Sequence, residues 1–156
     1  MLYYKMSIPD GPPPDLIFYY SVSNTINQID ESYLGTSLIQ TFNGPIFADF
    51  NLTQEIGKWV GTYTIYDVNK NDEVYQQTGI QTYYLPEGTI TIINNTQQIK
   101  NQQGEFVNKP GENVYQITSG SGNFLNYSGF LVNIAVKDTL TRTLLVYFSK
   151  TNAFSN

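Results

Sequence analysis

Residues 117–129 read ITSGSGNFLNYSG, with three glycines and four serine or threonine residues between two apolar runs. One interpretation is a nest of backbone amides that binds an anion, and the other is a tight connection between two strands. A phosphate-binding loop opens a helix, whereas the residues that follow Gly122, FLNYSGFLVNI, have the pattern of a strand. The stretch therefore predicts a hairpin in which Gly120 and Gly122 allow positive φ or close backbone approach, with Phe124 packed against the core.

Strand-like runs of similar character recur along the chain, about 10–15 residues apart. They are rich in β-branched and aromatic residues and are separated by turn formers, which is typical of an antiparallel barrel or sandwich. We expect turns at 43–45, 69–72 and 86–88, and one short helical turn near 26–35. The expected strands are 16–22, 36–42, 58–68, 73–84, 89–99, 114–119, 128–138 and 139–149, with 46–52 as loop or short strand.

The chain has 156 residues, enough for one domain with a core of its own. Residues 1–15 contain three consecutive prolines and predict an extended N-terminal arm. Residues 16–150 form the single β-barrel domain, and 151–156 form a short tail. No second domain or internal repeat is indicated.

Composition excludes several classes of function. There is no cysteine and no histidine, so disulfides, thiol chemistry and the commonest metal ligand are missing, and no metal or cofactor is expected. The net charge is −5 and Arg142 is the sole arginine, which argues against nucleic-acid binding. No apolar run reaches transmembrane length and no signal peptide is visible, so a cytoplasmic or virion-associated protein fits. The chain is rich in Asn, Ile and Tyr, which suggests an AT-rich genome such as that of a large DNA virus.

A family resemblance rests on the glycine-rich stretch and on one other segment. YQITSGSGNFLNYSGFLVNI (115–134) resembles the signature of the allene oxide cyclase and dirigent barrels, a G-G-[ST]-G-x-F turn followed by a glycine that begins the next strand. The segment with spaced glycines, Gly57–Asp67, resembles a second region of that superfamily. The resemblance implies an all-β, eight-stranded antiparallel up-and-down-type barrel, often trimeric, with a hydrophobic pocket at one mouth.

The resemblance carries over few functional residues. Asp49 matches a dirigent aspartate, whereas Tyr63 stands where the cyclases have a cysteine. Tyr20 and Ser21 replace the dirigent His-Asp pair, and Leu125 or Asn126 stands where dirigent proteins place an arginine.

Five residues are candidates for a ligand pocket: Tyr20, Asp49, Tyr63, Tyr84 and Tyr147. Asp49 and Tyr63 are also the candidate catalytic pair. A carboxylate in an aromatic barrel would have a raised pKa suited to acid catalysis, but an aspartate at this point also suits a turn. Tyrosine offers a flat apolar ring with a polar tip for binding, although most tyrosines are core or interface residues.

Arg142 lies mid-strand on a face with Leu140, Leu144, Val146 and Phe148. An arginine in this setting either binds an anionic ligand or forms an ion pair across a subunit interface, and we expect the interface.

Two functions from different classes follow. The first is a non-catalytic oligomeric barrel, most simply a homotrimer, with a structural or binding role. The second is a dirigent- or cyclase-like protein that holds a hydrophobic small molecule and guides its ring closure. A glycan is a third candidate ligand, because exposed tyrosines and amides suit sugars.

Overall fold

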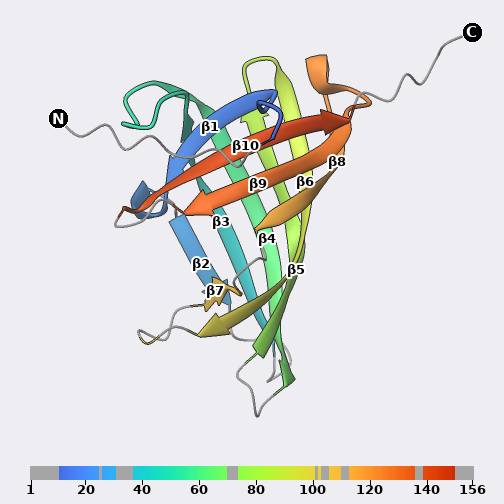
Figure 1. The fold of residues 1–156 in the computed structure, drawn as a ribbon. Helices are drawn as coiled ribbons and strands as arrows, with labels where there is room; N and C mark the ends of the chain where they lie inside the picture. The colour runs from blue at the N-terminus through green and yellow to red at the C-terminus, as the bar shows by residue number, and fades with distance from the viewer. Residues whose placement is uncertain are drawn as a thin grey trace, which may run out of the picture.

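The computed structural model describes residues 11–24, 26–30, 37–69, 74–100, 102, 106–109, 113–135 and 139–149. These residues form ten antiparallel strands and two single-turn 3-10 helices, η1 (Val22–Asn24) and η2 (Gly122–Phe124) (Figure 1). The strands are β1 (Leu16–Ser21), β2 (Ile26–Asp30), β3 (Ser37–Phe47), β4 (Glu55–Asn69), β5 (Val74–Leu85), β6 (Gly88–Lys100), β7 (Phe106–Asn108), β8 (Val114–Gly120), β9 (Ser128–Ala135) and β10 (Thr141–Ser149). In this part of the chain, no helix is long and apolar enough to cross a membrane.

Eight of the strands close into a barrel in the order β1-β10-β9-β8-β6-β5-β4-β3. Tyr19 of β1 pairs with Phe47 of β3 and completes the ring. The predicted eight-stranded antiparallel barrel is therefore confirmed. Strand β2 continues along β3 beyond β1, and β7 pairs with the far end of β6.

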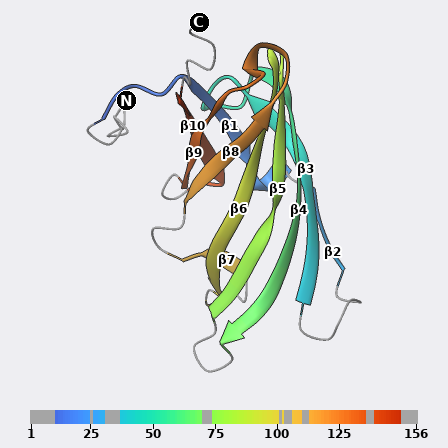
Figure 2. The ribbon, with the colours of Figure 1, turned by 90° about the vertical axis from the view of Figure 1, so that its right-hand side faces the viewer.

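The barrel is not equally deep all round (Figure 2). Strands β3 to β6 run its whole height, whereas β1, β8, β9 and β10 cover only the upper part. Along β6, β8 pairs with Ile90–Ile93 and β7 pairs with Gln98–Lys100. The barrel wall beside β6 is therefore split, because β8 forms its upper part and β7 its lower part (Figure 2).

The expected turn at 43–45 is wrong, because β3 runs straight through it from Ser37 to Phe47. Pro45 pairs with Lys58 of β4 on one side. On the other side, β2 ends opposite Asn43 and β1 reaches β3 only at Phe47. The missing N–H of proline thus falls at a gap in the ladder, where a strand tolerates it.

The expected helical turn near 26–35 is also wrong for the part that the structure describes. Residues 26–30 form β2, paired in register with β3 from Ile26↔Asn43 to Asp30↔Ile39. An open edge of a long strand offers backbone hydrogen bonds that outweigh weak local propensity. Residues 31–35 lie outside the described residues, as do 1–10 of the arm, the turn at 70–72 and the tail 151–156.

The described part of the arm is held on β10. The amide of Asp15 donates to the carbonyl of Val146 at 2.8 Å, and the amide of Phe148 donates to the carboxylate of Asp15 at 2.7 Å.

The glycine-rich stretch forms the predicted hairpin. Gly122 has φ +60°, and a Cβ on Gly120 would lie 2.3 Å from the carbonyl oxygen of Phe124. The loop is fixed to the β5–β6 turn, because the amide of Ser121 donates to Thr89 O at 3.0 Å and the amide of Asn123 donates to Glu87 O at 2.9 Å. Only the single 3-10 turn η2 and then strand β9 follow, and no α-helix begins here, so the anion-loop interpretation does not apply.

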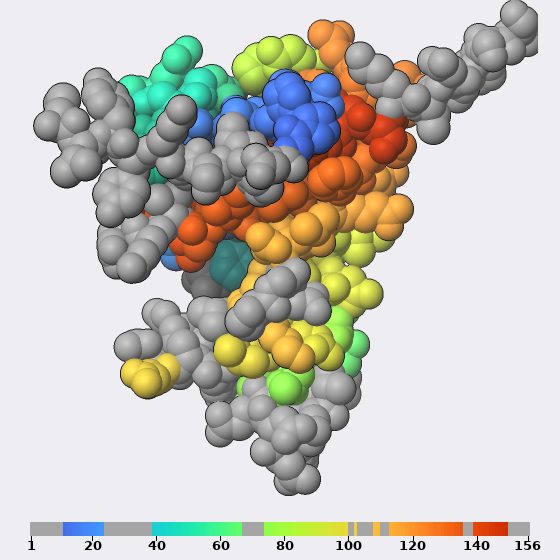
Figure 3. Space-filling model, in the orientation of Figure 1, coloured from blue at the N-terminus to red at the C-terminus, as the bar shows by residue number. Residues whose placement is uncertain are grey.

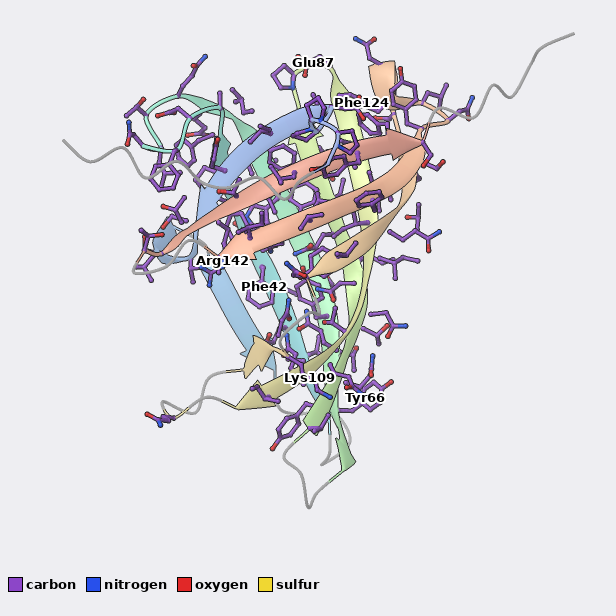
Figure 4. All side chains as sticks on the ribbon, in the orientation of Figure 1. Phe42, Tyr66, Glu87, Lys109, Phe124 and Arg142 are labelled. Carbon is purple, nitrogen blue, oxygen red and sulfur yellow. The ribbon has the colours of Figure 1, made fainter. Side chains whose placement is uncertain are left out.

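Phe124 closes the upper end of the barrel, next to Glu87 (Figure 4). Its ring is buried and stacks on Phe148 at 5.5 Å between centroids, with Tyr127 at 6.1 Å. Below it lies the core. The fully buried side chains there are Phe18, Ile46, Ile90, Ile92, Ile117, Leu131, Leu144 and Val146.

Candidate functional site

The inner wall of the barrel changes from apolar to polar along its axis. On β6, alternate residues point inward, and the buried series runs from Ile90 and Ile92 to Asn94, Thr96 and Gln98. Strands β3 and β5 continue this polar section. The buried polar side chains of the three strands are Gln40, Gln77, Gln81, Asn94, Thr96 and Gln98.

An aromatic belt separates the apolar and polar sections, and we use this name for Tyr20, Phe42, Trp59, Tyr63 and Tyr83. Trp59 lies at its centre, 5.1 Å from Tyr20 and 6.0 Å from the nearly parallel ring of Phe42. Tyr63 meets Phe42 edge-on at 5.1 Å, and Tyr83 lies 6.4 Å from Trp59. Phe42 is half-buried and the other four are buried, so Phe42 is the belt residue most open to solvent.

Two tyrosine hydroxyls near the belt accept hydrogen bonds from asparagine amides. The amide nitrogen of Asn133 donates to Tyr20 OH at 3.3 Å, and that of Asn108 donates to Tyr115 OH at 2.7 Å. Because each hydroxyl accepts in this bond, its own proton remains available for another acceptor. Tyr83 differs, since its hydroxyl already donates to Gln81 Oε1 at 3.0 Å.

Four buried polar atoms on the inner wall have no hydrogen-bond partner: Trp59 Nε1, Tyr63 OH, Gln77 Oε1 and Gln98 Oε1. Asn94 lies close enough to Tyr63 to lower its pKa, but not in hydrogen-bonding geometry. A buried polar group without a partner costs about 1–3 kcal/mol. Two unused donors and two unused acceptors therefore lie inside one barrel.

Two glycines hold Tyr63 flat against the wall. A Cβ on Gly79 would lie 2.6 Å from Tyr63 Cδ1 and 2.1 Å from the carbonyl oxygen of Thr62. A Cβ on Gly61 would lie 3.0 Å from Tyr63 OH. The ring thus crosses Gly79 and its hydroxyl reaches Gly61, which only residues without a side chain permit.

Burial raises the pKa of each inward-facing tyrosine. Desolvation is the largest cause, and it holds the pKa of Tyr63 and Tyr83 well above the usual value. It raises the pKa of Tyr20, and it raises that of Tyr115 to about 12. These hydroxyls stay protonated at physiological pH and act as neutral hydrogen-bond donors.

Arg142 lies at the rim of the split wall. It pairs across the sheet with Tyr20 on β1 and Ala135 on β9, and it shares the inner face of β10 with the buried Leu144 and Val146. Its side chain is half-buried. It is close enough to Tyr20 and Tyr115 to lower the pKa of both, against the larger effect of burial.

The surface is hollowed at this place (Figure 3). The hollow lies below the left-hand end of β9, with teal atoms of the β3–β4 part of the chain at its floor. Figure 4 shows the labelled Arg142 and Phe42 at the same level. Phe42 and Arg142 are both half-buried, and Phe42 belongs to the aromatic belt, so the hollow leads to the belt.

Among the residues predicted for a pocket, the structure brings Tyr20 and Tyr63 together in the belt. Tyr84 and Tyr147 point away from the interior. Tyr84 is exposed, with the Lys58 ammonium 5.8 Å above its ring, and Tyr147 stacks on the exposed Phe130 at 4.9 Å. Both belong to the outer face of the barrel.

Asp49 holds together the loop between β3 and β4. Its carboxylate accepts hydrogen bonds from the amides of Thr53 and Gln54 and from the Thr53 hydroxyl, at 2.7–3.2 Å. The Gln54 amide is the main reason why the pKa of Asp49 is lowered, which is the opposite of an acid catalyst's needs. The side chain therefore serves its own turn and makes no hydrogen bond to the buried Tyr63.

The sequence did not identify Tyr83, Tyr115 or the inward amides. Tyr83 adjoins the predicted Tyr84, and a shift of one residue in a strand moves a side chain to the opposite face. The alternation Ile90, Ile92, Asn94 in β6 was a usable signal, because the polar residue continues the face of two buried isoleucines. No group of three or more Asp or Glu residues that could hold a metal ion occurs in the described segments.

Comparisons with known proteins support the architecture. Among solved structures, the chain is similar to a pyocyanin demethylase, with a TM-score of 0.55 and 14% sequence identity over 86% of this chain and 98% of that chain. No family model and no curated protein sequence matches. At this identity the similarity shows a shared fold alone.

Proposed function

We propose that the protein binds a flat, mainly apolar small molecule in the hollow between β9 and β7, against the aromatic belt, without transforming it. The belt offers ring surfaces of the kind that stack on an aromatic ligand. The ligand carries hydrogen-bonding groups, because the wall around the belt has unused donors and acceptors.

The observation that carries this proposal is the set of buried atoms without partners. Trp59 Nε1 and Tyr63 OH both belong to rings that pack on Phe42, the half-buried ring at the floor of the hollow. A ligand that displaces the Phe42 ring would give these donors an acceptor. The unpaired donors destabilise the free protein, and a ligand that accepts their hydrogen bonds removes this destabilisation.

Binding is favoured over catalysis by the titratable groups on the inner face. Those that the structure describes are Arg142 and the buried tyrosines, and burial raises the pKa of these tyrosines further away from neutral pH. General acid–base catalysis works best with a pKa near the operating pH. The alternative is a dirigent- or cyclase-like role, which the neutral hydroxyls favour because they could stabilise a developing oxyanion during ring closure.

The resemblance to the allene oxide cyclase and dirigent barrels is part of this proposal, and it supports a small-molecule ligand in the barrel. The substrate of the pyocyanin demethylase is not carried over to this chain.

We also propose that the barrel is an oligomer, most simply a homotrimer. On its outer face, a register row crosses five strands through Ile80, Ile93, Gln116, Phe130 and Tyr147. Ile80, Ile93 and Phe130 are exposed. Apolar rows of this kind commonly mark an interface between chains, and light scattering after gel filtration would test it by reporting a trimer or a monomer.

Calorimetric titration with 2-naphthalenemethanol, a flat neutral probe with one hydroxyl, tests the binding function. We expect saturable 1:1 binding that weakens about tenfold in Tyr63→Phe, which removes one hydrogen bond. The matched control is Tyr84→Phe, which removes a hydroxyl from the outer face and should leave the affinity unchanged. Absence of saturable binding to this alcohol and to the corresponding acid would refute the function.

A further inference from the structure

The half-buried side chain of Arg142 lacks an anionic partner in the described parts of the chain. No carboxylate there forms an ion pair with it, and it is the one charged side chain described on the inner face. A partly desolvated cation without a counter-charge is unfavourable by itself. Its surroundings are consequently suited to receive an anion.

Two further donors converge beside Arg142. Tyr20 is its register partner on β1, and Tyr115 lies within its electrostatic reach. Asn133 and Asn108 donate to these two hydroxyls, which leaves both hydroxyl protons free to donate. A planar guanidinium with two hydroxyl donors matches the oxygens of a carboxylate, because arginine binds that group with two parallel hydrogen bonds.

The aromatic belt begins at the same place. The ring of Tyr20 lies 5.1 Å from Trp59, which stacks on Phe42 at the floor of the hollow. An acid group held by Arg142 would therefore have its ring system against these aromatic faces.

We propose that the ligand is an aromatic carboxylate, anchored by Arg142 together with the hydroxyls of Tyr20 and Tyr115, with its ring on Trp59 in the place of the displaced Phe42 ring. This assignment rests on the proposed binding function and specifies its ligand class. The sequence allowed two roles for Arg142, binding of an anionic ligand and an ion pair across a subunit interface. Here we propose the first of these.

The test compares 2-naphthoate with 2-naphthalenemethanol by calorimetric titration at pH 7. A charge-assisted pair should make the carboxylate bind roughly 10- to 100-fold more tightly than the alcohol. Arg142→Gln should lower the affinity for the carboxylate to that for the alcohol and so abolish this preference. Arg142→Lys keeps the charge without the planar fork and should retain part of the preference.

Lys58→Gln is the matched control, because it removes one positive charge from the outer face and should leave the preference intact. Thermal melts of all variants establish that each is folded. Equal binding of acid and alcohol to the wild type, or a preference that survives Arg142→Gln, would overturn the anchor while the binding function stands. Failure of both probes to bind would overturn the function and the anchor together.

Discussion

Replacing Tyr63 by phenylalanine should stabilise the free protein. The hydroxyl is buried, with the residue 2% exposed, and it has no hydrogen-bond partner. The ring packing on Phe42 and Gly79 is retained in the variant. An unpartnered buried hydroxyl costs about 1–3 kcal/mol, and the small space left by one oxygen offsets part of the gain. We expect a net gain of about 1 kcal/mol, which is a rise in Tm of roughly 2–4 °C for a chain of this length.

The neighbouring tyrosine provides a control of opposite sign. Tyr83 OH donates to Gln81 Oε1 at 3.0 Å, and both residues are buried. Tyr83→Phe removes that bond and leaves the amide oxygen without a partner, which should destabilise the protein by about 1–3 kcal/mol. Both variants are compared with the wild type by thermal and urea denaturation followed by circular dichroism. If Tyr63→Phe is destabilised as much as Tyr83→Phe, then the Tyr63 hydroxyl has a hydrogen-bond partner in the folded protein and is not an unused donor.

Three further predictions concern the barrel that positions the site. Phe124→Ala should lower the free energy of unfolding in urea by about 3–5 kcal/mol, because it removes the buried ring that closes the upper end of the barrel. A loss below about 1 kcal/mol would contradict this role of the ring. Gly79→Ala should cost about 3 kcal/mol or more, because its Cβ would overlap the backbone of Thr62, and an unchanged Tm would contradict the close approach. Burial raises the pKa of Tyr115 from 10.0 to about 12 in the folded protein. Its contribution to the free energy of unfolding is therefore complete below pH 10 and is lost as the pH rises toward 12. The difference corresponds to about 3 kcal/mol. Tyrosinate absorbance at 295 nm should show the buried tyrosines titrating only with unfolding, whereas an ordinary titration of all of them would contradict their burial.

The fold was largely readable from the sequence because its signals are local. The glycines at 120 and 122 specify a tight hairpin, and alternation in β4 puts Trp59, Gly61 and Tyr63 on one face, which is the inner face in the structure. The errors arose where a distant strand decides the outcome. Residues 43–45 look like a turn, but β4 pairs with them throughout, and 26–30 become a strand because β3 offers an edge.

The site was less predictable, because it depends on how strands far apart in the chain meet. Tyr20 and Tyr115 come near Arg142 only through the closure of β1, β8, β9 and β10, which no local pattern encodes. Asp49 shows the opposite case, since a lone carboxylate after a strand is used by its own turn. The presence of tyrosines alone was also insufficient to identify the residues that line the pocket. A shift of one residue in the strand register moves a side chain from the inner to the outer face.

The most direct test of the binding site uses the only tryptophan and the only arginine in the chain. In a ¹H–¹⁵N correlation spectrum, Trp59 gives the single indole N–H signal and Arg142 the single arginine Nε–H signal. On titration with 2-naphthoate, both signals should shift and saturate together with one Kd. The proposed site is wrong if both signals stay in place while others move, or if no signal shows saturable change.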